Sequence, residues 1–161
     1  MRKLKIREIK QKELSLLQDF LYEAIFKKDE KSPLSKKAIK KPELKVYIED
    51  FGQEDDNCLV AEVNDKIVGA VWSRIFKGDI KGFGYIDDQT PELAISLYKG
   101  YRNQGIGTKL MKNMIELLKE KGYNQISLSV QKDNYAVKMY EKFGFEVEKE
   151  LDEEYIMVCE L

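Results

Sequence analysis

The stretch YRNQGIGTKL, Tyr101 to Leu110, decides the fold of this 161-residue chain, because it joins a strand pattern to a helix pattern. Gly105 and Gly107 lie where the helical spacing begins, and Gly122 is a natural end for that helix. Glycines at a helix start let an anion approach the first-turn N–H groups, which have no helical partners. The helix dipole adds a partial positive charge at the same place. The stretch therefore predicts a phosphate-binding loop, although a glycine turn that merely joins the strand to the helix fits the loop alone equally.

Single residues decide among three phosphate-loop motifs. The Walker motif requires a lysine where Ile106 stands, which argues against a nucleoside triphosphatase. The dinucleotide motif requires a third glycine where Leu110 stands. The pattern Arg/Gln-x-x-Gly-x-Gly fits the segment from Arg102 to Gly107.

Hydrophobic periodicity predicts the elements on either side of this loop. Alternation predicts strands, and apolar residues at helical spacing predict helices. A turn at Asn64 and Asp65 indicates an antiparallel hairpin, whereas the strand-helix-strand unit from 92 to 131 indicates a parallel crossover. The predicted strands cover 3–9, 58–63, 66–76, 93–98, 125–130, 145–151 and 154–161, and the helices about 12–27, 34–50, 105–122 and 134–143.

These elements predict an α/β fold in one domain, residues 1–161. We expect a single mixed, mostly antiparallel sheet of about seven strands flanked by about four helices, with helices on both faces. The segment 77–90 is rich in glycine and aspartate and is expected to be a loop. Pro42 is either a first-turn residue of the second helix or a break in it.

Composition narrows the class of protein. Hydrophobic residues make up 43% and charged residues 35%, as in ordinary globular proteins, and the net charge of −1 argues against a nucleic-acid protein held by a broad basic surface. No apolar run approaches the ~18 residues that span a bilayer, and MRKLKIREI lacks the apolar core of a signal peptide. Cys58 and Cys159 are expected to be buried free thiols in a cytoplasmic protein.

The absence of histidine narrows the chemistry. It excludes Ser-His and Cys-His nucleophile pairs and histidine-ligated metal sites, and the two cysteines form no CxxC motif. Acid–base chemistry therefore falls to Glu, Asp, Tyr, Cys or Lys, and no metal is expected.

A second block, NYAVKMYEKFGF at residues 134–145, supplies the context of the glycine loop. Together with LAISLYKGYRNQGIGTKLM at residues 93–111, it resembles the GNAT superfamily, the acetyl-CoA-dependent N-acetyltransferases. The matching blocks lie within residues 92–145, about a third of the chain, and the order of predicted elements agrees with the family. The segment IDDQTPELAIS also resembles bacterial members of unassigned acceptor.

The resemblance implies transfer of an acetyl group from acetyl-CoA directly to a primary amine. The alternative is a non-catalytic acyl-CoA-binding sensor or interaction module with the same fold. In the family, backbone groups of the fourth strand pair with the pantetheine arm of coenzyme A, and amides of the glycine loop hold its pyrophosphate. Arg102 positions that loop as much as it touches the ligand. The implied cofactor-binding residues are Ile95, Ser96, Leu97, Arg102, Asn103, Gln104, Gly105, Ile106, Gly107, Thr108 and Asn134.

Two side chains match catalytic positions of the family. Tyr140 matches the general acid that protonates the leaving thiolate, although its apolar helical face also suits a core tyrosine. Glu92 matches the position where several members place a glutamate base, acting directly or through water, although a surface carboxylate at a strand end fits equally. Asp87 and Asp88 are weaker candidates for the base. A backbone N–H near Leu97 is expected to stabilise the oxyanion.

The acceptor is the least determined part of the prediction. In this fold it meets the first two helices and the loop before the fourth strand. Aromatic and acidic side chains there suit a cationic amine of a small molecule, peptide or protein, whereas Arg74 suits an acceptor with a carboxylate, and both remain open. We expect a monomer or homodimer, with no nucleic acid or membrane partner. The side chains in question are Tyr22, Phe26, Tyr47, Trp72, Arg74, Tyr85, Asp87 and Asp88.

Overall fold

The computed structural model describes residues 3–25 and 40–161, which form seven strands and four α-helices. The helices are α1 (Leu16–Ile25), α2 (Pro42–Lys45), α3 (Ile106–Glu120) and α4 (Ala136–Lys142). The strands are β1 (Leu4–Glu8), β2 (Asn57–Val63), β3 (Lys66–Arg74), β4 (Glu92–Leu97), β5 (Gln125–Gln131), β6 (Glu146–Glu150) and β7 (Glu154–Glu160).

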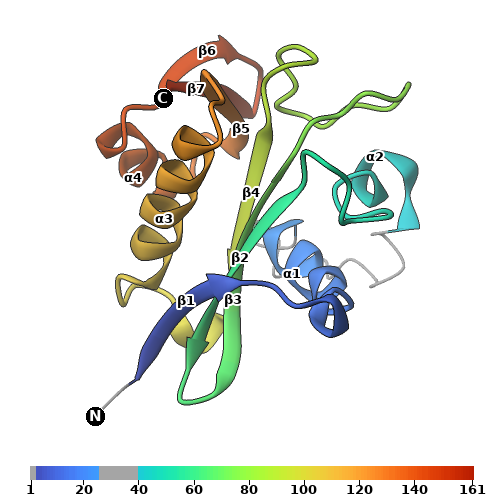
Figure 1. Ribbon diagram of the computed structural model, residues 1–161. Coiled ribbons are helices and arrows are strands. Elements are labelled where there is room, and N and C mark those ends of the chain that lie inside the picture. Colours follow the sequence, from blue (N-terminus) through green and yellow to red (C-terminus); the bar gives the residue numbers. More distant parts are fainter. Residues whose placement is uncertain (1–2, 26–39) are drawn as a thin grey trace.

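All seven strands form one sheet in the order β1-β2-β3-β4-β5-β7-β6 (Figure 1). Neighbouring strands are antiparallel except β4 and β5, which are parallel. The β2–β3 turn has positive φ angles at Asn64 (50°) and Asp65 (71°), as a tight hairpin turn requires. The predicted mixed sheet is therefore confirmed.

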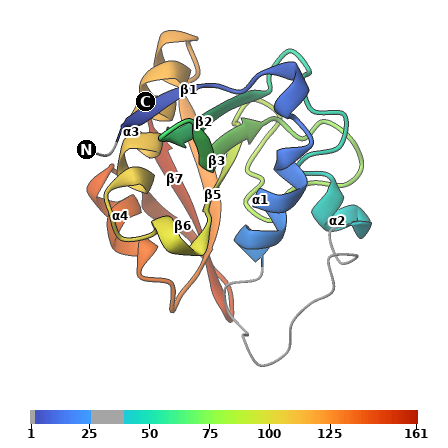
Figure 2. The same cartoon turned by 90° about the horizontal axis from the view of Figure 1, so that it is seen from below.

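Each face of the sheet carries its own apolar core. Helices α3 and α4 cover one face, and α1 with the segment around α2 covers the other (Figures 1 and 2). Side chains of β4 alternate between the two: Leu93 packs on the α3 side and Ala94 on the α1 side. This arrangement confirms helices on both faces, and it places Glu92 and Ser96 on the α1 side.

The first helix is shorter than the predicted range of 12–27. Gln11–Glu13 form a separate 3-10 turn, and α1 begins at Leu16. The Glu13 carboxylate accepts hydrogen bonds from the Arg7 guanidinium at 2.8 and 2.9 Å and from the Lys10 backbone N–H at 2.8 Å. These contacts fix a tight turn that the apolar spacing alone does not reveal.

The second helix is also much shorter than predicted. Part of its predicted range, including Ser35, lies outside the described residues, and α2 covers only Pro42–Lys45, with Pro42 in the first turn. After α2 the chain continues in turns as far as Asp50. The carbonyls of this segment accept hydrogen bonds from side chains of β3, described below. Backbone turns such as the hydrogen bond from the Glu49 N–H to the Lys45 carbonyl (2.9 Å) continue here, but tertiary contacts take up the later carbonyls that a longer helix would use.

The remaining boundaries follow the sequence closely. Residues 77–90 form a loop, as predicted. Gly122 (φ 90°) and Gly144 (φ 98°) take the left-handed conformation directly after the ends of α3 and α4. Cys58 and Cys159 are buried free thiols, as expected. None of the helices in the described residues is long and apolar enough to cross a membrane.

Candidate functional site

A gap opens in the sheet between β4 and β5. The two strands are paired at one position, Glu92 with Ser127, where the Ser127 N–H donates to the Pro91 carbonyl at 3.0 Å. Toward the other end of β4, the Tyr98 N–H donates to Val68 of β3 at 2.9 Å. Backbone groups alternate along a strand, so in β4 the N–H and carbonyl groups of even-numbered residues face β3 and those of odd-numbered residues face β5. Beyond Glu92, the odd-numbered residues therefore face the gap.

This alternation separates the three residues predicted to pair with pantetheine. Peptide groups of Ile95 and Leu97 face the gap, whereas those of Ser96 face β3. Backbone pairing by Ser96 with a ligand in the gap is therefore not available in this geometry. The Leu97 carbonyl already accepts a hydrogen bond from Arg102 Nε at 3.1 Å. The Leu97 N–H and both the N–H and the carbonyl of Ile95 remain directed at the gap.

The glycine loop ends directly at the first turn of α3. Asn103 (φ 60°) and Gly105 (φ 83°) take the left-handed conformation, and Gly105 is the N-cap residue. At this helix start no side chain accepts a capping hydrogen bond from the first-turn N–H groups, which are those of Ile106, Gly107 and Thr108. A Cβ at position 105 would meet no atom within 4 Å, so the space beside these groups is open. The arrangement suits a phosphate group.

Two side chains of the motif hold the loop in place. Besides its bond to Leu97, Arg102 forms an ion pair with Glu23 of α1 at 3.2 Å. Gln104 Nε2 donates to the Gly100 carbonyl at 3.0 Å. Arg102 thus has the supporting role that the sequence left open, joining the loop to α1 and to β4.

The start of α4 lies beside the same loop. Asn134 Oδ1 accepts a hydrogen bond from the Ala136 N–H at 2.8 Å, and Tyr135 rather than Asn134 is the N-cap residue of α4. The hydroxyl of the next residue, Tyr135, donates to Asn103 Oδ1 at 3.1 Å. Sequence reasoning missed Tyr135, an exposed residue whose contact spans two segments 32 residues apart.

Tyr140 lies on the buried side of α4, against Phe145 at a ring distance of 5.8 Å. Burial raises the pKa of the Tyr140 hydroxyl to about 12. A phenol of this kind keeps its proton at neutral pH, so the proton is available to a base that forms directly beside the hydroxyl.

Glu92 is buried at the point where the gap begins, with 3% of its surface exposed. The Tyr47 hydroxyl donates a short hydrogen bond to Oε2, whereas Oε1 has no hydrogen-bond partner among the described residues. Burial raises the pKa of Glu92 to about 7, although the hydrogen bond from Tyr47 opposes the rise. The expectation of a surface carboxylate is therefore wrong, and the carboxyl can gain and lose a proton near neutral pH.

Other buried polar atoms lie on the same face. The Ser96 and Ser127 hydroxyls are buried and, like Glu92 Oε1, have no hydrogen-bond partner within the described part of the chain. Ser96 shares the α1 side with Glu92 by alternation along β4, and Ser127 shares it because it is paired with Glu92. Unsatisfied buried groups are costly and are concentrated at functional sites.

The acceptor candidates divide into several groups. Trp72 is core, and Asp87 Oδ1 caps a turn by accepting from the Gln89 N–H and the Thr90 hydroxyl, both at 2.8 Å. The exposed Asp88 binds the Tyr85 hydroxyl and Lys81. Neither aspartate is buried as Glu92 is. Phe26 lies outside the described residues.

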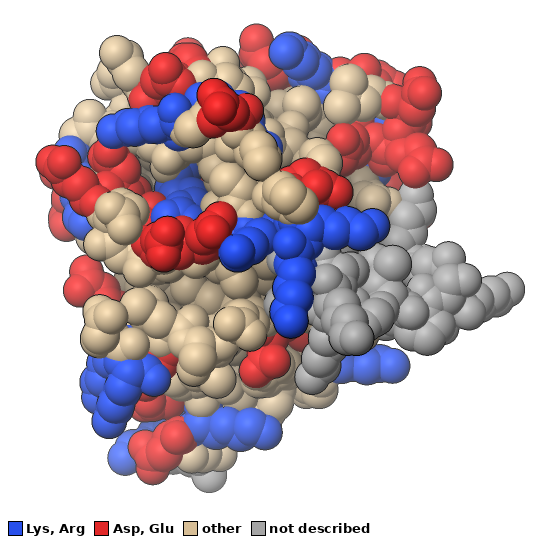
Figure 3. Space-filling view, turned by 90° about the vertical axis from the view of Figure 1, so that its right-hand side faces the viewer, with Lys and Arg blue, Asp and Glu red and all other residues tan. Residues whose placement is uncertain are grey.

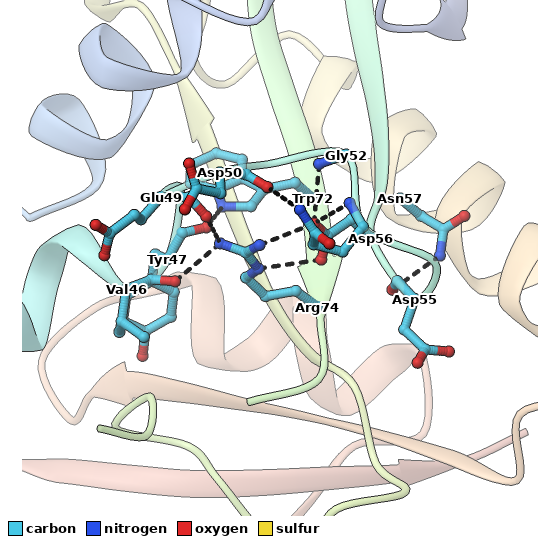
Figure 4. Close-up of polar contacts among 11 residues, drawn as sticks. Val46, Tyr47, Glu49, Asp50, Gly52, Asp55, Asp56, Asn57, Trp72 and Arg74 are labelled. Carbon is cyan, nitrogen blue, oxygen red and sulfur yellow. Dashed lines mark hydrogen bonds and ion pairs between the residues drawn. The ribbon is translucent and has the colours of Figure 1, made fainter. Parts of the chain in front are cut away.

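Arg74 is not a receptor for an acceptor carboxylate. Its guanidinium is buried and binds Asp56 through Nε at 3.0 Å and Nη2 at 2.8 Å. Its Nη1 donates to the carbonyls of Val46 (3.0 Å) and Glu49 (2.9 Å), as Figure 4 shows. Every nitrogen of the guanidinium therefore has a partner within the protein, so none is left to bind the carboxylate of an acceptor.

Charges on the surface are mixed in sign. Figure 3 shows Lys and Arg side chains interspersed with Asp and Glu on one face, without a continuous basic patch on its described part. Among residues 3–25 and 40–161, no group of three or more Cys, Asp and Glu residues is placed to hold a metal ion.

Comparisons with known proteins agree with this geometry. The model of the acetyltransferase (GNAT) family matches residues 21–145. Over 87 residues the chain is 38% identical to N-alpha-acetyltransferase 30 of Schizosaccharomyces pombe, covering 53% of this chain and 55% of that protein. Over 114 residues it is 30% identical to an N-alpha-acetyltransferase of Sulfurisphaera tokodaii, covering 68% of each. The chain spans about half the length of the first curated relatives that it matches.

A solved structure extends the likeness to the whole fold. The PaiA N-acetyltransferase of Thermoplasma acidophilum, in complex with coenzyme A, superposes with a TM-score of 0.73 at 20% identity over 99% of both chains. At this identity the likeness concerns the fold alone.

Proposed function

Because this chain belongs to the GNAT family of acetyltransferases, we propose that it transfers an acetyl group from acetyl-CoA to a primary amine. One observation carries the proposal: the free backbone edge at Ile95 and Leu97 lies a few residues before the uncapped start of α3. An extended pantetheine arm pairs with a strand edge, and a pyrophosphate binds at a helix start. The chain offers both in the order in which coenzyme A presents them.

The described residues offer a partner for each part of the cosubstrate. Backbone groups of Ile95 and Leu97 would pair with the pantetheine arm, and the amides of Ile106, Gly107 and Thr108 would hold the pyrophosphate. Gly105 leaves the approach open. Arg102, Gln104 and Asn134 support the site by holding the loop and the start of α4.

Glu92 is the proposed base. An alkylammonium has a pKa near ~10.4, so the acceptor is protonated at neutral pH and must lose a proton before its nitrogen can attack. With a pKa of about 7, the Glu92 carboxylate takes that proton near neutral pH and is still largely ionised above it. A general base of this kind contributes roughly a hundredfold or more to the rate.

The other steps fall to the gap and to α4. As the C–N bond forms, negative charge develops on the thioester oxygen, and one of the N–H groups directed at the gap, that of Ile95 or Leu97, would stabilise that charge while the remaining backbone groups pair with the pantetheine arm. Such donors are worth about 3 kcal/mol in other enzymes. As the C–S bond breaks, Tyr140 gives its proton to the sulfur and recovers one from the nitrogen of the new amide.

The acceptor is proposed to be a cationic amine, with peptide N-termini tried first. Three curated relatives are named N-alpha-acetyltransferases, which supports that order. The occupation of Arg74 argues against recognition of a carboxylate by that side chain.

Thiol release from acetyl-CoA tests the proposal. The panel should include peptides with free N-termini, lysine-bearing peptides, polyamines and amino sugars, with N-terminally acetylated, lysine-free peptides as controls. We expect release with at least one free amine and no release with the blocked peptides. Saturable binding of acetyl-CoA without release for any amine would instead favour the non-catalytic sensor.

A further inference from the structure

Tyr47 joins three segments that are distant in sequence. It follows α2, and its side chain is buried. Its hydroxyl donates to Glu92 Oε2 at the start of β4 and accepts a hydrogen bond at 2.7 Å from the Phe83 N–H in the β3–β4 loop. The ring packs edge-on against Phe76 at 5.2 Å and is stacked on Phe83 at 6.4 Å. One phenol therefore holds both the proposed base and the loop beside it.

The backbone that carries Tyr47 is held by β3. Trp72 Nε1 donates to the Tyr47 carbonyl at 3.2 Å, and Arg74 Nη1 donates to the carbonyls on either side, at Val46 and Glu49 (Figure 4). Asp56 fixes the other side of the same guanidinium. Side chains of β3 thus hold the carbonyls around Tyr47, and backbone turns such as the hydrogen bond from the Tyr47 N–H to the Leu44 carbonyl (3.1 Å) hold its N–H, which leaves the ring little freedom to shift.

Tyr47 is the main partner of the carboxylate, and the Gly84 backbone to a lesser extent also lowers the pKa of Glu92. Arg74 is paired with Glu92 across β3 and β4, but its guanidinium is turned to Asp56 and the two carbonyls. Glu154 of β7 is the other charged group that acts on both Glu92 and Tyr47, and its negative charge opposes ionisation of each. No ion pair within the described residues neutralises Glu92.

The two oxygens of the carboxylate differ in their surroundings. Tyr47 occupies Oε2, and Oε1 lies over Gly82 in the loop. A Cβ at position 82 would stand 2.1 Å from Oε1 and 2.7 Å from the Phe76 ring. Only glycine at position 82 leaves this oxygen room.

We propose that Tyr47 is a positioning residue for the reaction: it holds Glu92 through Oε2 so that Oε1, above Gly82, receives the proton of the acceptor amine. The role rests on the proposed function, in which Glu92 is the base. It assigns Tyr47 no contact with either substrate. The same hydroxyl also holds the β3–β4 loop over the carboxylate through the Phe83 N–H.

Tyr47→Phe tests the proposal, with Tyr123→Phe as the matched control. Both changes remove a hydroxyl that donates to a carboxylate, but Tyr123 binds Asp55, far from Glu92 in the sequence and in a different hydrogen-bonded pair. The first readout is a carbon-13 NMR titration of the Glu92 carboxyl, identified by its loss in Glu92→Gln. We expect its midpoint to rise by about one pH unit in Tyr47→Phe and to stay unchanged in the control.

The second readout is the pH dependence of acetyl transfer. In Tyr47→Phe the acidic limb of kcat should move upward with the carboxyl midpoint and kcat should fall by ~10-fold or more, while KM for acetyl-CoA is unchanged. An unmoved carboxyl midpoint would overturn the proposal, as would a midpoint that moves without the acidic limb. Because the NMR titration needs no turnover, its outcome is independent of whether the chain acetylates amines.

A second pair of variants tests the Oε1 side if Tyr47→Phe does not fold. Gly82→Ala places a methyl group on Oε1, whereas Gly78→Ala in the same loop would meet no atom within 4 Å. We expect Gly82→Ala to lower kcat by ~10-fold or more and to shift the Glu92 carboxyl resonance, with Gly78→Ala like the wild type. Equal behaviour of the two variants would overturn the assignment of Oε1.

Discussion

At the scale of single residues, Glu92 shows what the sequence could and could not reveal. Its place at the start of β4 follows from strand alternation and from the resemblance carried by the neighbouring motif. Its burial does not, because Tyr47, Gly82 and Ser127 reach it from three other segments. The sequence names Tyr47 only as a candidate for contact with the acceptor, because its link to Glu92 depends on a partner 45 residues away.

Glu92→Gln should lower activity and raise stability. The folded pKa of about 7 lies above the ordinary value of 4.5, so the folded chain binds this proton more tightly than the unfolded chain does. That stabilisation is complete below pH 4.5 and is lost as the pH rises through 7. We expect kcat to fall ~100-fold or more, and the free energy of unfolding at pH 8 to rise by up to about 3 kcal/mol.

Urea unfolding at pH 5 and pH 8 measures the stability part of this prediction. Glu146→Gln, at an exposed position of β6, is the control and should leave the difference between the two pH values as in the wild type. An unchanged pH dependence of both stability and rate in Glu92→Gln would contradict the assignment of the base.

Tyr140→Phe isolates the proposed general acid. The ring keeps its packing against Phe145, so the melting temperature should change little. Loss of the proton donor should lower kcat by ~100-fold, because the thiolate of coenzyme A then leaves without being protonated. The KM for acetyl-CoA should be unchanged. Steady-state kinetics with an accepted amine decides the matter, and full turnover would make Tyr140 a core residue only.

At the scale of elements, the glycine loop is the part that the sequence predicts best. Its conformation depends on its own residues, because Asn103 and Gly105 adopt left-handed φ angles and α3 follows at once. The segment around Tyr47 is the opposite case. Its apolar spacing predicts a long helix, but Trp72 and Arg74 bind its carbonyls and end α2 after Lys45. Contacts across the fold override propensity there.

Gly105→Ala and Gly107→Ala form a matched pair for the loop. Gly105 has a φ of 83°, so alanine costs about 1 to 2 kcal/mol, and its methyl group enters the open approach to the α3 amides. At Gly107 a Cβ would make ordinary contact with Leu97 at 3.6 Å, and alanine favours the helix by up to ~1 kcal/mol. Calorimetry should show weaker binding of acetyl-CoA in Gly105→Ala alone. Equal losses of affinity in both variants would contradict the proposed pyrophosphate site at the start of α3.

Arg74→Lys tests how the segment around Tyr47 is held. Lysine cannot reproduce a planar fork that binds Asp56 and two carbonyls together, and breaking a buried pair costs about 3 to 5 kcal/mol when one partner is lost. We expect a loss of roughly 2 kcal/mol or more in chemical unfolding. Lys45→Gln, which removes an exposed pair with Glu49, should cost ~0.5 kcal/mol or less. Similar losses in the two variants would contradict this role.

At the scale of the whole molecule, the sheet was predictable because hydrophobic alternation and one parallel crossover leave few topologies. The gap was not predictable, because it depends on β4 and β5 being paired only at Glu92 and Ser127. In this register the backbone N–H and carbonyl groups of Ile95 and Leu97 face the gap, whereas those of Ser96 face β3. The distinction among three adjacent residues requires the strand register, which alternation in the sequence does not provide.

The most direct test of the account is a crystal structure of this chain with coenzyme A. We predict hydrogen bonds from the pantetheine arm to the backbone of Ile95 and Leu97, and a pyrophosphate on the amides of Ile106, Gly107 and Thr108. Coenzyme A bound elsewhere, or held through the backbone of Ser96 with the gap empty, would contradict the account.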